Sequence, residues 1–153
     1  MNIVYATDDN GALGTGVSIV SLMENLPPGV HADIYIMTGG LSGDNMARFH
    51  SLQQGYNLHL HFIDMKDKYT DFPVGSKWSA ATYYRLGLAG ELPATVERAL
   101  YVDIDTIFNR DISPMYESEF GDCLIAGVFT TEDLSEESFS RWKREMNLDR
   151  DSI

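Results

Sequence analysis

Apolar residues in the first part of the chain alternate between short continuous runs and segments of helical spacing. Runs of strand length occupy residues 3–7, 32–37 and 58–62, and the last alternates strictly, which predicts a strand buried on one face. Apolar residues recur every three or four positions over 13–26 and 42–55, which predicts two amphipathic helices. This order of strands and helices predicts an α/β fold with a mostly parallel sheet flanked by helices.

Turn and capping residues mark the ends of the two predicted helices. Pro27, Pro28 and Gly29 end the first helix. Ser42 is the expected N-cap of the second. The ends and the periodicity therefore agree on where these helices lie.

The second half of the chain has a more mixed pattern. We expect a helix over residues 79–88, a strand over 99–102, a further strand over 124–129 and a charged helix over 135–146. No internal repeat, low-complexity tract or linker interrupts this pattern. Residues 1–153 are therefore predicted to form a single domain.

Composition and charge narrow the class of protein. The 153 residues are 44% hydrophobic and carry a formal net charge of −12. This content is enough for a globular core, and the acidic charge argues against nucleic acid and anionic membrane surfaces as partners. The single cysteine, Cys123, excludes an internal disulfide and fits a reducing compartment. With no apolar run of membrane-spanning length and no signal-peptide pattern, we expect a soluble, cytoplasmic protein without a transmembrane segment.

Two acidic residues, Asp103 and Asp105, directly follow the fourth predicted strand. On an extended backbone their side chains share one face, where two carboxylates repel each other unless a cation lies between them or one stays protonated. The expected cation is a hard divalent ion bound through oxygen, Mn²⁺ or Mg²⁺. The alternative is that both acids are solvated turn residues at a strand end.

The first predicted strand also ends in polar residues, Asp8, Asp9 and Asn10. If the first and fourth strands are neighbours, both polar ends face one crevice at the carboxyl edge of the sheet. Asn10 and the backbone N–H groups before the first helix suit a base, a ribose or a phosphate. An Asx turn with a helix cap is the alternative, and it accounts for any one of these residues.

Arg85 is a cation in a segment otherwise rich in Ala, Tyr and Leu. One interpretation is a bidentate clamp on a pyrophosphate or on a metal-bound carboxylate. The other is an ion pair with Glu91 or with a carboxylate of the sheet.

Two histidines, His59 and His61, share one face of the third predicted strand. We interpret them as the solvated side of that strand, with a metal-binding pair as the alternative. The chain has no Gly-x-Ser-x-Gly, no P-loop and no Gly-x-Gly-x-x-Gly that opens a helix. Their absence argues against serine hydrolases, P-loop NTPases and dinucleotide-dependent dehydrogenases.

Several segments together resemble glycosyltransferase family 8, the retaining enzymes that include bacterial lipopolysaccharide galactosyltransferases and glycogenin. The Asp-x-Asp motif of that family matches Asp103 and Asp105. The matching segments follow the family's order and spacing, and they are residues 2–10, 16–22, 41–42, 81–86, 100–105 and 111–116.

This resemblance implies a GT-A fold that binds a UDP-sugar with Mn²⁺ and transfers a hexose, with retention, to a saccharide or glycolipid acceptor. It implies that Asp103 and Asp105 hold the ion and that Arg85 lies near the donor sugar and its phosphates. Peripheral membrane association is compatible with the full-length protein. Weaker candidates for the acceptor side are Ser79 and Thr82, and the other donor-site residues that it implies are Ala6, Thr7, Asp8, Asp9, Asn10 and Ile104.

The chain departs from the family in length. Family members are roughly twice as long, near the upper range of single domains. The distal histidine that supplies their third metal ligand has no counterpart among the four histidines here. We therefore expect a chain that is truncated at its C-terminus and corresponds to the donor-binding half. We also expect weak binding of Mn²⁺ and UDP, little or no transfer, and self-association through exposed apolar surface at a sheet edge.

Two functional alternatives stay open at this point. One is a non-catalytic domain that binds a nucleotide-sugar. The other is a phosphatase of the haloacid-dehalogenase type, which also uses Asp-x-Asp, with the first Asp as nucleophile. In that class the motif lies in the first strand, whereas here about a hundred residues precede it, a third or more of a typical domain.

Overall fold

The computed structural model of this chain describes residues 1–72 and 79–127. Contacts group the chain into two compact units, Met1–Glu117 and Ser118–Ile153. In the second unit, residues 118–127 are described and form no helix or strand. The strand predicted over 124–129 is therefore wrong in its described part, where Leu124 and Ile125 are exposed and no strand pairs with them. The helix predicted over 135–146 lies outside the described residues.

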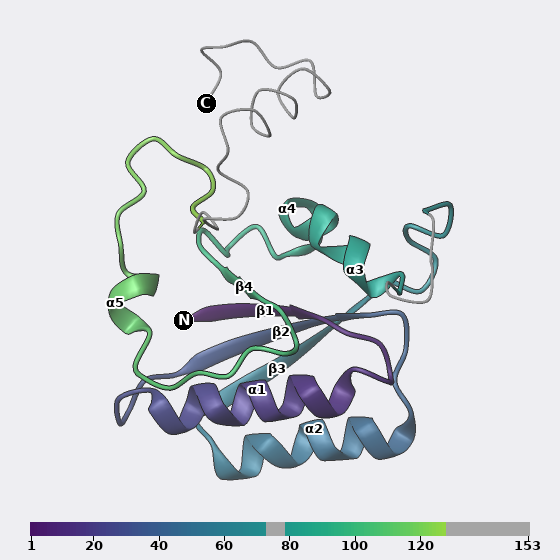
Figure 1. Ribbon diagram of the computed structural model, residues 1–153, viewed down its shortest axis with the longest axis horizontal. Helices are drawn as coiled ribbons and strands as arrows, with labels where there is room; N and C mark the ends of the chain where they lie inside the picture. The colour runs from purple at the N-terminus through teal and green to yellow at the C-terminus, as the bar shows by residue number, and fades with distance from the viewer. Residues whose placement is uncertain (73–78, 128–153) are drawn as a thin grey trace, which may run out of the picture. The chain divides into compact units, whose positions relative to one another are not determined.

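Four parallel strands of the first unit form one sheet in the order β3-β2-β1-β4 (Figure 1). Their bounds are Asn2–Ala6 for β1, Ala32–Thr38 for β2, Leu58–Asp64 for β3 and Leu100–Val102 for β4. The central strand is β1, in which Tyr5 lies opposite Ile36 on one side and Val102 on the other. The four strands predicted in this unit, and their mostly parallel arrangement, are confirmed.

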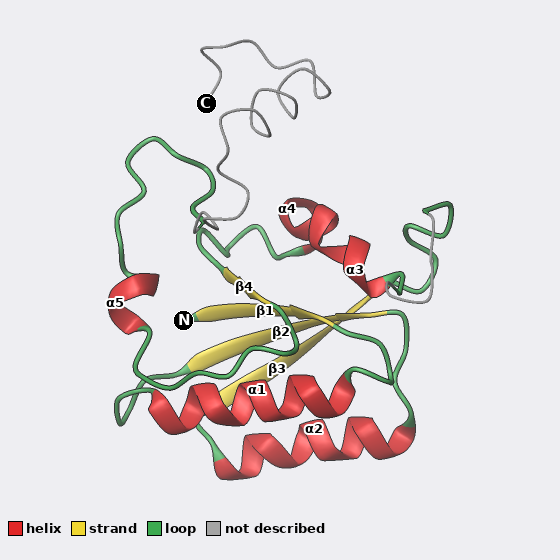
Figure 2. Cartoon of the chain, viewed as in Figure 1, coloured by secondary structure: helices red, strands yellow, loops and turns green. Residues whose placement is uncertain are grey.

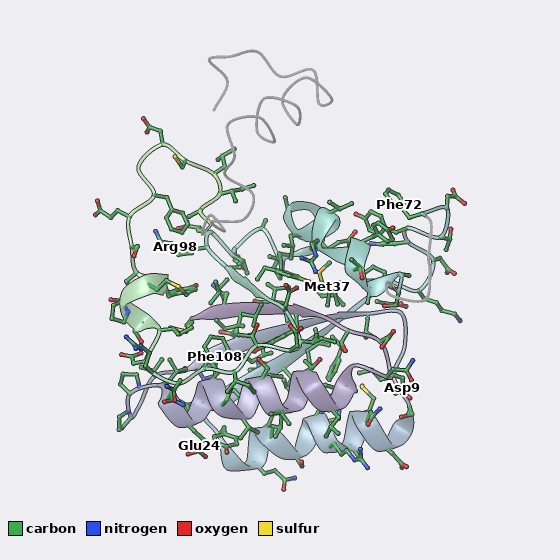
Figure 3. The ribbon with its side chains drawn as sticks, in the orientation of Figure 1. Asp9, Glu24, Met37, Phe72, Arg98 and Phe108 are labelled. Atoms are coloured by element: carbon green, nitrogen blue, oxygen red, sulfur yellow. The ribbon has the colours of Figure 1, made fainter. Side chains whose placement is uncertain are left out.

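Helices cover both faces of this sheet (Figure 2). On one face lie α1 (Ala12–Asn25) and α2 (Gly43–Gly55), which match the two helices predicted from apolar spacing. The core beneath them contains Ile3, Tyr5, Ile19, Leu22, Ile34, Ile36 and Phe49. On the other face lie α3 (Ala81–Tyr84) and α4 (Leu88–Glu91). The core on that side contains Val4, Tyr35, Met37, Met65 and Tyr84, of which Met37 is labelled in Figure 3.

Local polar contacts fix where the long helices begin. The Ser42 hydroxyl accepts a hydrogen bond from the Asn45 N–H at 3.4 Å, which confirms Ser42 as the N-cap of α2. Before α1, the Asp8 carboxylate accepts a bond from the Gly11 N–H at 2.9 Å. Both helices therefore start beside the loop that follows β1.

The helix predicted over 79–88 is only partly correct. The segment forms α3, a 3₁₀ turn η1 (Arg85–Gly87) and α4 in succession. Glycines at 87 and 90 lower the helix propensity, and the Tyr69 hydroxyl lies 2.7 Å from where a Cβ of Gly87 would be. A further short helix, α5 (Ser113–Tyr116), is held to β1 by the Asn2 N–H, which donates to the Tyr116 hydroxyl at 2.9 Å.

Candidate donor-binding site

The strand order reverses at the carboxyl ends of β1 and β4. The chain runs from β1 to β2 and β3 on one side, and then returns to the other side of β1 to form β4. Open α/β sheets bind their ligands at such a switch point, because the two connections leave in opposite directions and open a crevice. The prediction that the two polar strand ends lie on neighbouring strands is therefore confirmed.

A polar cavity of about 320 Å³ opens at this switch point. It brings together residues from the end of β1, from the segment around α3 and from the turn after β4. Of the residues predicted for the site, Asp9 and Asn10 are not among those that line it. The lining residues are Ala6, Thr7, Asp8, Ser79, Ala81, Thr82, Arg85, Tyr101, Asp103, Ile104 and Asp105.

Asp103 and Asp105 lie in a turn and not on an extended strand end. β4 ends at Val102, and the Thr106 N–H donates to the Asp103 carbonyl at 3.1 Å, which closes the turn. The expectation of a shared strand face is thus wrong in its geometry. Both carboxylates nevertheless line the same cavity, because the turn folds over the end of β1.

Arg85 makes an ion pair with the first of these two acids. Its Nη2 lies 2.8 Å from the Asp103 Oδ1, and its Nε donates to the Thr82 carbonyl at 3.1 Å. The side chains of Arg85 and Asp103 are 42% and 56% exposed, so water screens much of their attraction. The alternative partner Glu91 pairs with Lys68 instead.

Tyr101 is a residue of the cavity wall that the sequence reasoning missed. The Arg85 guanidinium lies over its ring, 4.7 Å from the centroid. Burial raises the pKa of Tyr101, and Asp103 adds to this while Arg85 opposes it. The available signal was its place in the strand that directly precedes Asp103.

Asp8 and Asp9 both serve the local fold. Asp9 accepts bonds from the Ser42 N–H at 2.7 Å and from the Asn45 Nδ2 at 2.8 Å, and Figure 3 shows it beside the first turn of α2. The bond from Ser42, followed by that from Asn45, lowers the pKa of the Asp9 carboxyl. The alternative of a local turn ahead of the first helix therefore describes Asp8, which also lines the cavity, whereas Asp9 bonds residues at the start of α2 that are far away in the sequence.

Two glycines, one before α1 and one in its first turn, leave space for the turn after β4 to pack against this end of the helix. A Cβ at Gly11 would lie 2.6 Å from the Ile104 Cδ1, and a Cβ at Gly14 would lie 3.1 Å from the Ile104 carbonyl oxygen. Neither glycine was assigned a role from the sequence. The spacing of three between Gly11 and Gly14, which puts both on one side of the first turn, was the signal available.

The chemistry of this cavity fits a hard cation and an anionic ligand. Asp103 and Asp105 offer carboxylate oxygens, the donors that Mn²⁺ and Mg²⁺ prefer. Among the described residues that line the cavity, Arg85 is the one cation. Asp8 lines the same cavity, but within residues 1–72 and 79–127 no third carboxylate, imidazole or thiolate lies within metal-ligand spacing of both acids. The described residues thus supply two ligands and leave the remaining coordination positions of such an ion to other groups.

The sequence was compared with models of known protein families. The model of "Glycosyl transferase family 8" matches residues 2–152. The chain belongs to this family. The resemblance found in the sequence is therefore confirmed over almost its whole length.

The chain is similar to curated bacterial proteins. The chain is 29% identical over 142 residues to lipopolysaccharide 1,2-glucosyltransferase of Escherichia coli (strain K12), covering 92% of this chain and 42% of that protein. It is 26% identical over 130 residues to general stress protein A of Bacillus subtilis (strain 168), covering 84% of this chain and 46% of that protein. The chain thus spans less than half the length of these curated relatives.

A solved structure of the galactosyltransferase LgtC, in complex with donor and acceptor sugar analogues, has the same fold. It superimposes with a TM-score of 0.77 at 25% identity, covering 97% of this chain and 52% of LgtC. This agreement confirms the GT-A type α/β fold predicted from the sequence. Among the helices of residues 1–72 and 79–127, none is long and apolar enough to span a membrane.

Proposed function

We propose that this chain carries the donor-binding site of a glycosyltransferase that uses a UDP-sugar and a divalent ion. In this proposal a hexose is transferred to a saccharide or glycolipid acceptor with retention of configuration. The ion is Mn²⁺, with Mg²⁺ as the alternative. Membership of family 8 and the names of the lipopolysaccharide glycosyltransferases among its relatives support the reaction class and the acceptor class.

One observation carries the proposal: a single polar cavity is lined by Asp103, Asp105 and Arg85 and by the end of β1. A nucleoside diphosphate needs a surface for its base and ribose and positive charge for its phosphates. Ala6, Thr7 and Asp8 supply the surface for the base and ribose, with Asn10 and Asp9 in the adjoining loop. The positive charge for the phosphates comes from Arg85 and from the ion that the two acids would hold.

The residues have distinct roles in this proposal. Asp103 and Asp105 hold the ion, and the backbone at Ile104 positions them. The ion, when bound, acts as a Lewis acid that offsets the charge developing on the UDP leaving group. Arg85 exchanges its present partner, Asp103, for a donor phosphate, to which a guanidinium binds in a bidentate manner. Ser79 and Thr82, on the side of the cavity near α3, are the candidates for the acceptor.

Binding is expected to be weak. Two protein carboxylates leave most of the coordination shell of the ion to water, and each missing ligand costs affinity and orientation. We therefore expect detectable binding of UDP with Mn²⁺ but little or no transfer by this chain of 153 residues. A non-catalytic nucleotide-sugar-binding domain is the second candidate, favoured by the 42% of the glucosyltransferase that the chain covers.

Calorimetric titration of UDP, with and without Mn²⁺, tests the proposal. The heat of binding should depend on Mn²⁺, and Asp103→Asn or Asp105→Asn should weaken the Mn²⁺-dependent binding at least roughly tenfold. Asp44→Asn is the matched control, because Asp44 is an exposed acid on α2 outside the cavity. UDP binding that is independent of Mn²⁺, or equal losses in all three variants, would contradict the proposal.

Turnover separates the two candidate functions. The chain is incubated with a UDP-hexose, Mn²⁺ and a lipopolysaccharide-core oligosaccharide. The anomeric configuration of any product is then read by NMR. Transfer with retention supports the enzyme, and binding without transfer supports the non-catalytic domain.

The phosphatase alternative is excluded by membership of family 8. The cytoplasmic location stays a prediction.

Self-association also stays a prediction. Among the described residues, Leu13 and Val17 of α1 are exposed and line an apolar groove of about 300 Å³ with Phe49 and Leu52. This groove lies between helices α1 and α2, whereas the sequence analysis expected the apolar surface at a sheet edge. A monodisperse monomer in light scattering would contradict the prediction.

A further inference from the structure

Three of the four histidines of the chain gather around one carboxylate, Asp33, away from the donor cavity. Asp33 is near the start of β2, and His59 lies opposite it at the start of β3, the edge strand of the sheet (Figure 1). His61 follows on the same face. These residues lie toward the amino ends of parallel strands, whereas the donor cavity lies at the carboxyl ends of β1 and β4.

The donor atoms of this cluster are close together. One ligand atom from each of Asp33, His59 and His61 can be chosen so that all three lie within 4.8 Å of one another. The His61 Nε2 is 2.8 Å from the Asp33 Oδ1, and the rings of His59 and His61 are 4.4 Å apart. Two ligands of one tetrahedral zinc ion are about 3.4 Å apart at bond lengths of about 2.1 Å. The His61–Asp33 distance is shorter than this value, and no two of the chosen ligand atoms are more than 4.8 Å apart, so small side-chain rotations would suffice.

The surrounding residues hold the cluster in position. The His61 ring is stacked on Tyr35 with centroids 4.5 Å apart and planes 12° from parallel. His31 lies on the other side of the carboxylate, with its Nε2 3.7 Å from the Asp33 Oδ2. Its Nδ1 is 3.1 Å from the Asn57 Oδ1, the kind of outer contact that orients a metal-binding imidazole. The cluster is one-third exposed at Asp33 and His61, so an ion can reach it.

We propose that Asp33, His59 and His61 form a binding site for a divalent transition metal of the zinc type, with His31 placed to become a fourth ligand. Two imidazoles and a carboxylate are a donor set that zinc and its neighbours bind in proteins. The donor cavity offers oxygen ligands and suits Mn²⁺ or Mg²⁺. The chain therefore carries two cation sites of different ion preference, and this second site does not depend on the proposed transferase function.

Titration of the chelator-treated full chain with Zn²⁺ tests this site, with calorimetry for affinity and the visible spectrum of bound Co²⁺ for coordination. We expect Zn²⁺ binding that persists in the Asp103→Asn, Asp105→Asn double variant. His59→Ala, at an exposed position, and Asp33→Asn, which keeps the side-chain shape, should each weaken it at least tenfold. His50→Ala is the matched control, because His50 lies on α2, outside the cluster.

Each alternative outcome overturns the proposal. Absence of Zn²⁺ binding would mean that the cluster is an ion-pair network only. Loss of Zn²⁺ binding in the Asp103→Asn, Asp105→Asn variant, with retention in His59→Ala, would put the ion in the donor cavity. Equal affinity of His59→Ala and the unaltered chain would also refute the site. Circular dichroism of each variant shows that a loss of binding is not a loss of fold.

Discussion

Replacing Gly14 by alanine tests whether the start of α1 positions the turn that carries Asp103 and Asp105. A Cβ at Gly14 would lie 3.1 Å from the carbonyl oxygen of Ile104, a backbone atom between Asp103 and Asp105. Because a methyl group needs more space than this, the carbonyl must move by a few tenths of an ångström. Both carboxylates belong to the same turn and would move with it.

Gly16→Ala is the matched control in the same helix. A Cβ at Gly16 meets nothing within 4 Å, so the substitution adds no contact. Alanine in a helix interior is favoured over glycine by about 0.8–1.0 kcal/mol. We therefore expect Gly16→Ala to raise the melting temperature by about 2–4 °C, as this free energy does in chains of this size. The affinity for UDP with Mn²⁺ should not change.

Gly14→Ala should separate stability from binding. Part of its gain in helix propensity is offset by the displaced carbonyl, so its melting temperature should rise less than that of Gly16→Ala. Sites of this kind tolerate displacements of about 0.5 Å before they lose function. We expect a loss of affinity for UDP with Mn²⁺ of roughly three- to tenfold, between no effect and the hundredfold that a 1 Å misplacement can cost.

Thermal unfolding and calorimetric titration of the two variants measure these effects. If Gly14→Ala is stabilised as much as Gly16→Ala and binds UDP with the same affinity, the turn after β4 is not held by α1. The reasoning from the Ile104 contact would then be refuted. If neither variant folds, both glycines are needed for reasons other than the space around a Cβ, which also contradicts the argument.

Three further predictions concern single side chains. Arg85→Ala should tighten the binding of Mn²⁺ alone by roughly 1.4- to 5-fold, because the exposed ion pair with Asp103 that it removes is worth about 0.2–1 kcal/mol. The same substitution should weaken the binding of UDP with Mn²⁺. Calorimetry that shows both affinities changing in the same direction would contradict this prediction. Burial raises the pKa of Tyr5 from 10.0 to about 12. This shift contributes about 3 kcal/mol to the free energy of unfolding below pH 10, and the contribution is lost as the pH rises through 12. Tyr5→Phe should therefore lose less stability than the unaltered chain in urea unfolding over this interval, and parallel curves would disprove the assignment. The pKa of Asp9 is lowered from 3.8, so its contribution is present above pH 3.8 and is lost as the pH falls through the lowered value. In Asp9→Asn the free energy of unfolding should fall less steeply as the pH is lowered. An unchanged pH dependence would count against a role of the Asp9 carboxylate in holding the start of α2.

The local structure of this chain could be predicted because it depends on neighbouring residues. Apolar spacing located α1 and α2 to within a residue or two. The serine at the start of the second apolar segment, Ser42, was correctly predicted as its N-cap. The helix predicted over 79–88 was less accurate, because the Tyr69 hydroxyl packs where Gly87 leaves space. That contact joins residues far apart in the sequence and leaves no periodic signal.

The sequence predicted some residues of the candidate cavity but not its geometry. The acids after two strands and Arg85 were evident from the sequence, whereas Tyr101 was missed and Asp9 and Asn10 do not line the cavity. The ion pair between Arg85 and Asp103, the turn at 103–106 and the bonds of Asp8 and Asp9 required the structure. Each depends on side-chain direction or backbone conformation, which spacing along the chain does not fix.

The sequence by itself determined the elements, the family and the chemistry available at the end of each strand. Only the tertiary structure decided which strand ends meet. Placing β4 beside β1 pairs Tyr5 with Val102 and creates the polar cavity, and the register of β2 with β3 puts Asp33 opposite His59. Such pairings are made by backbone hydrogen bonds between distant segments, and a shift of one residue would turn every side chain to the other face. Both cation sites proposed for this protein therefore depend on strand order and register.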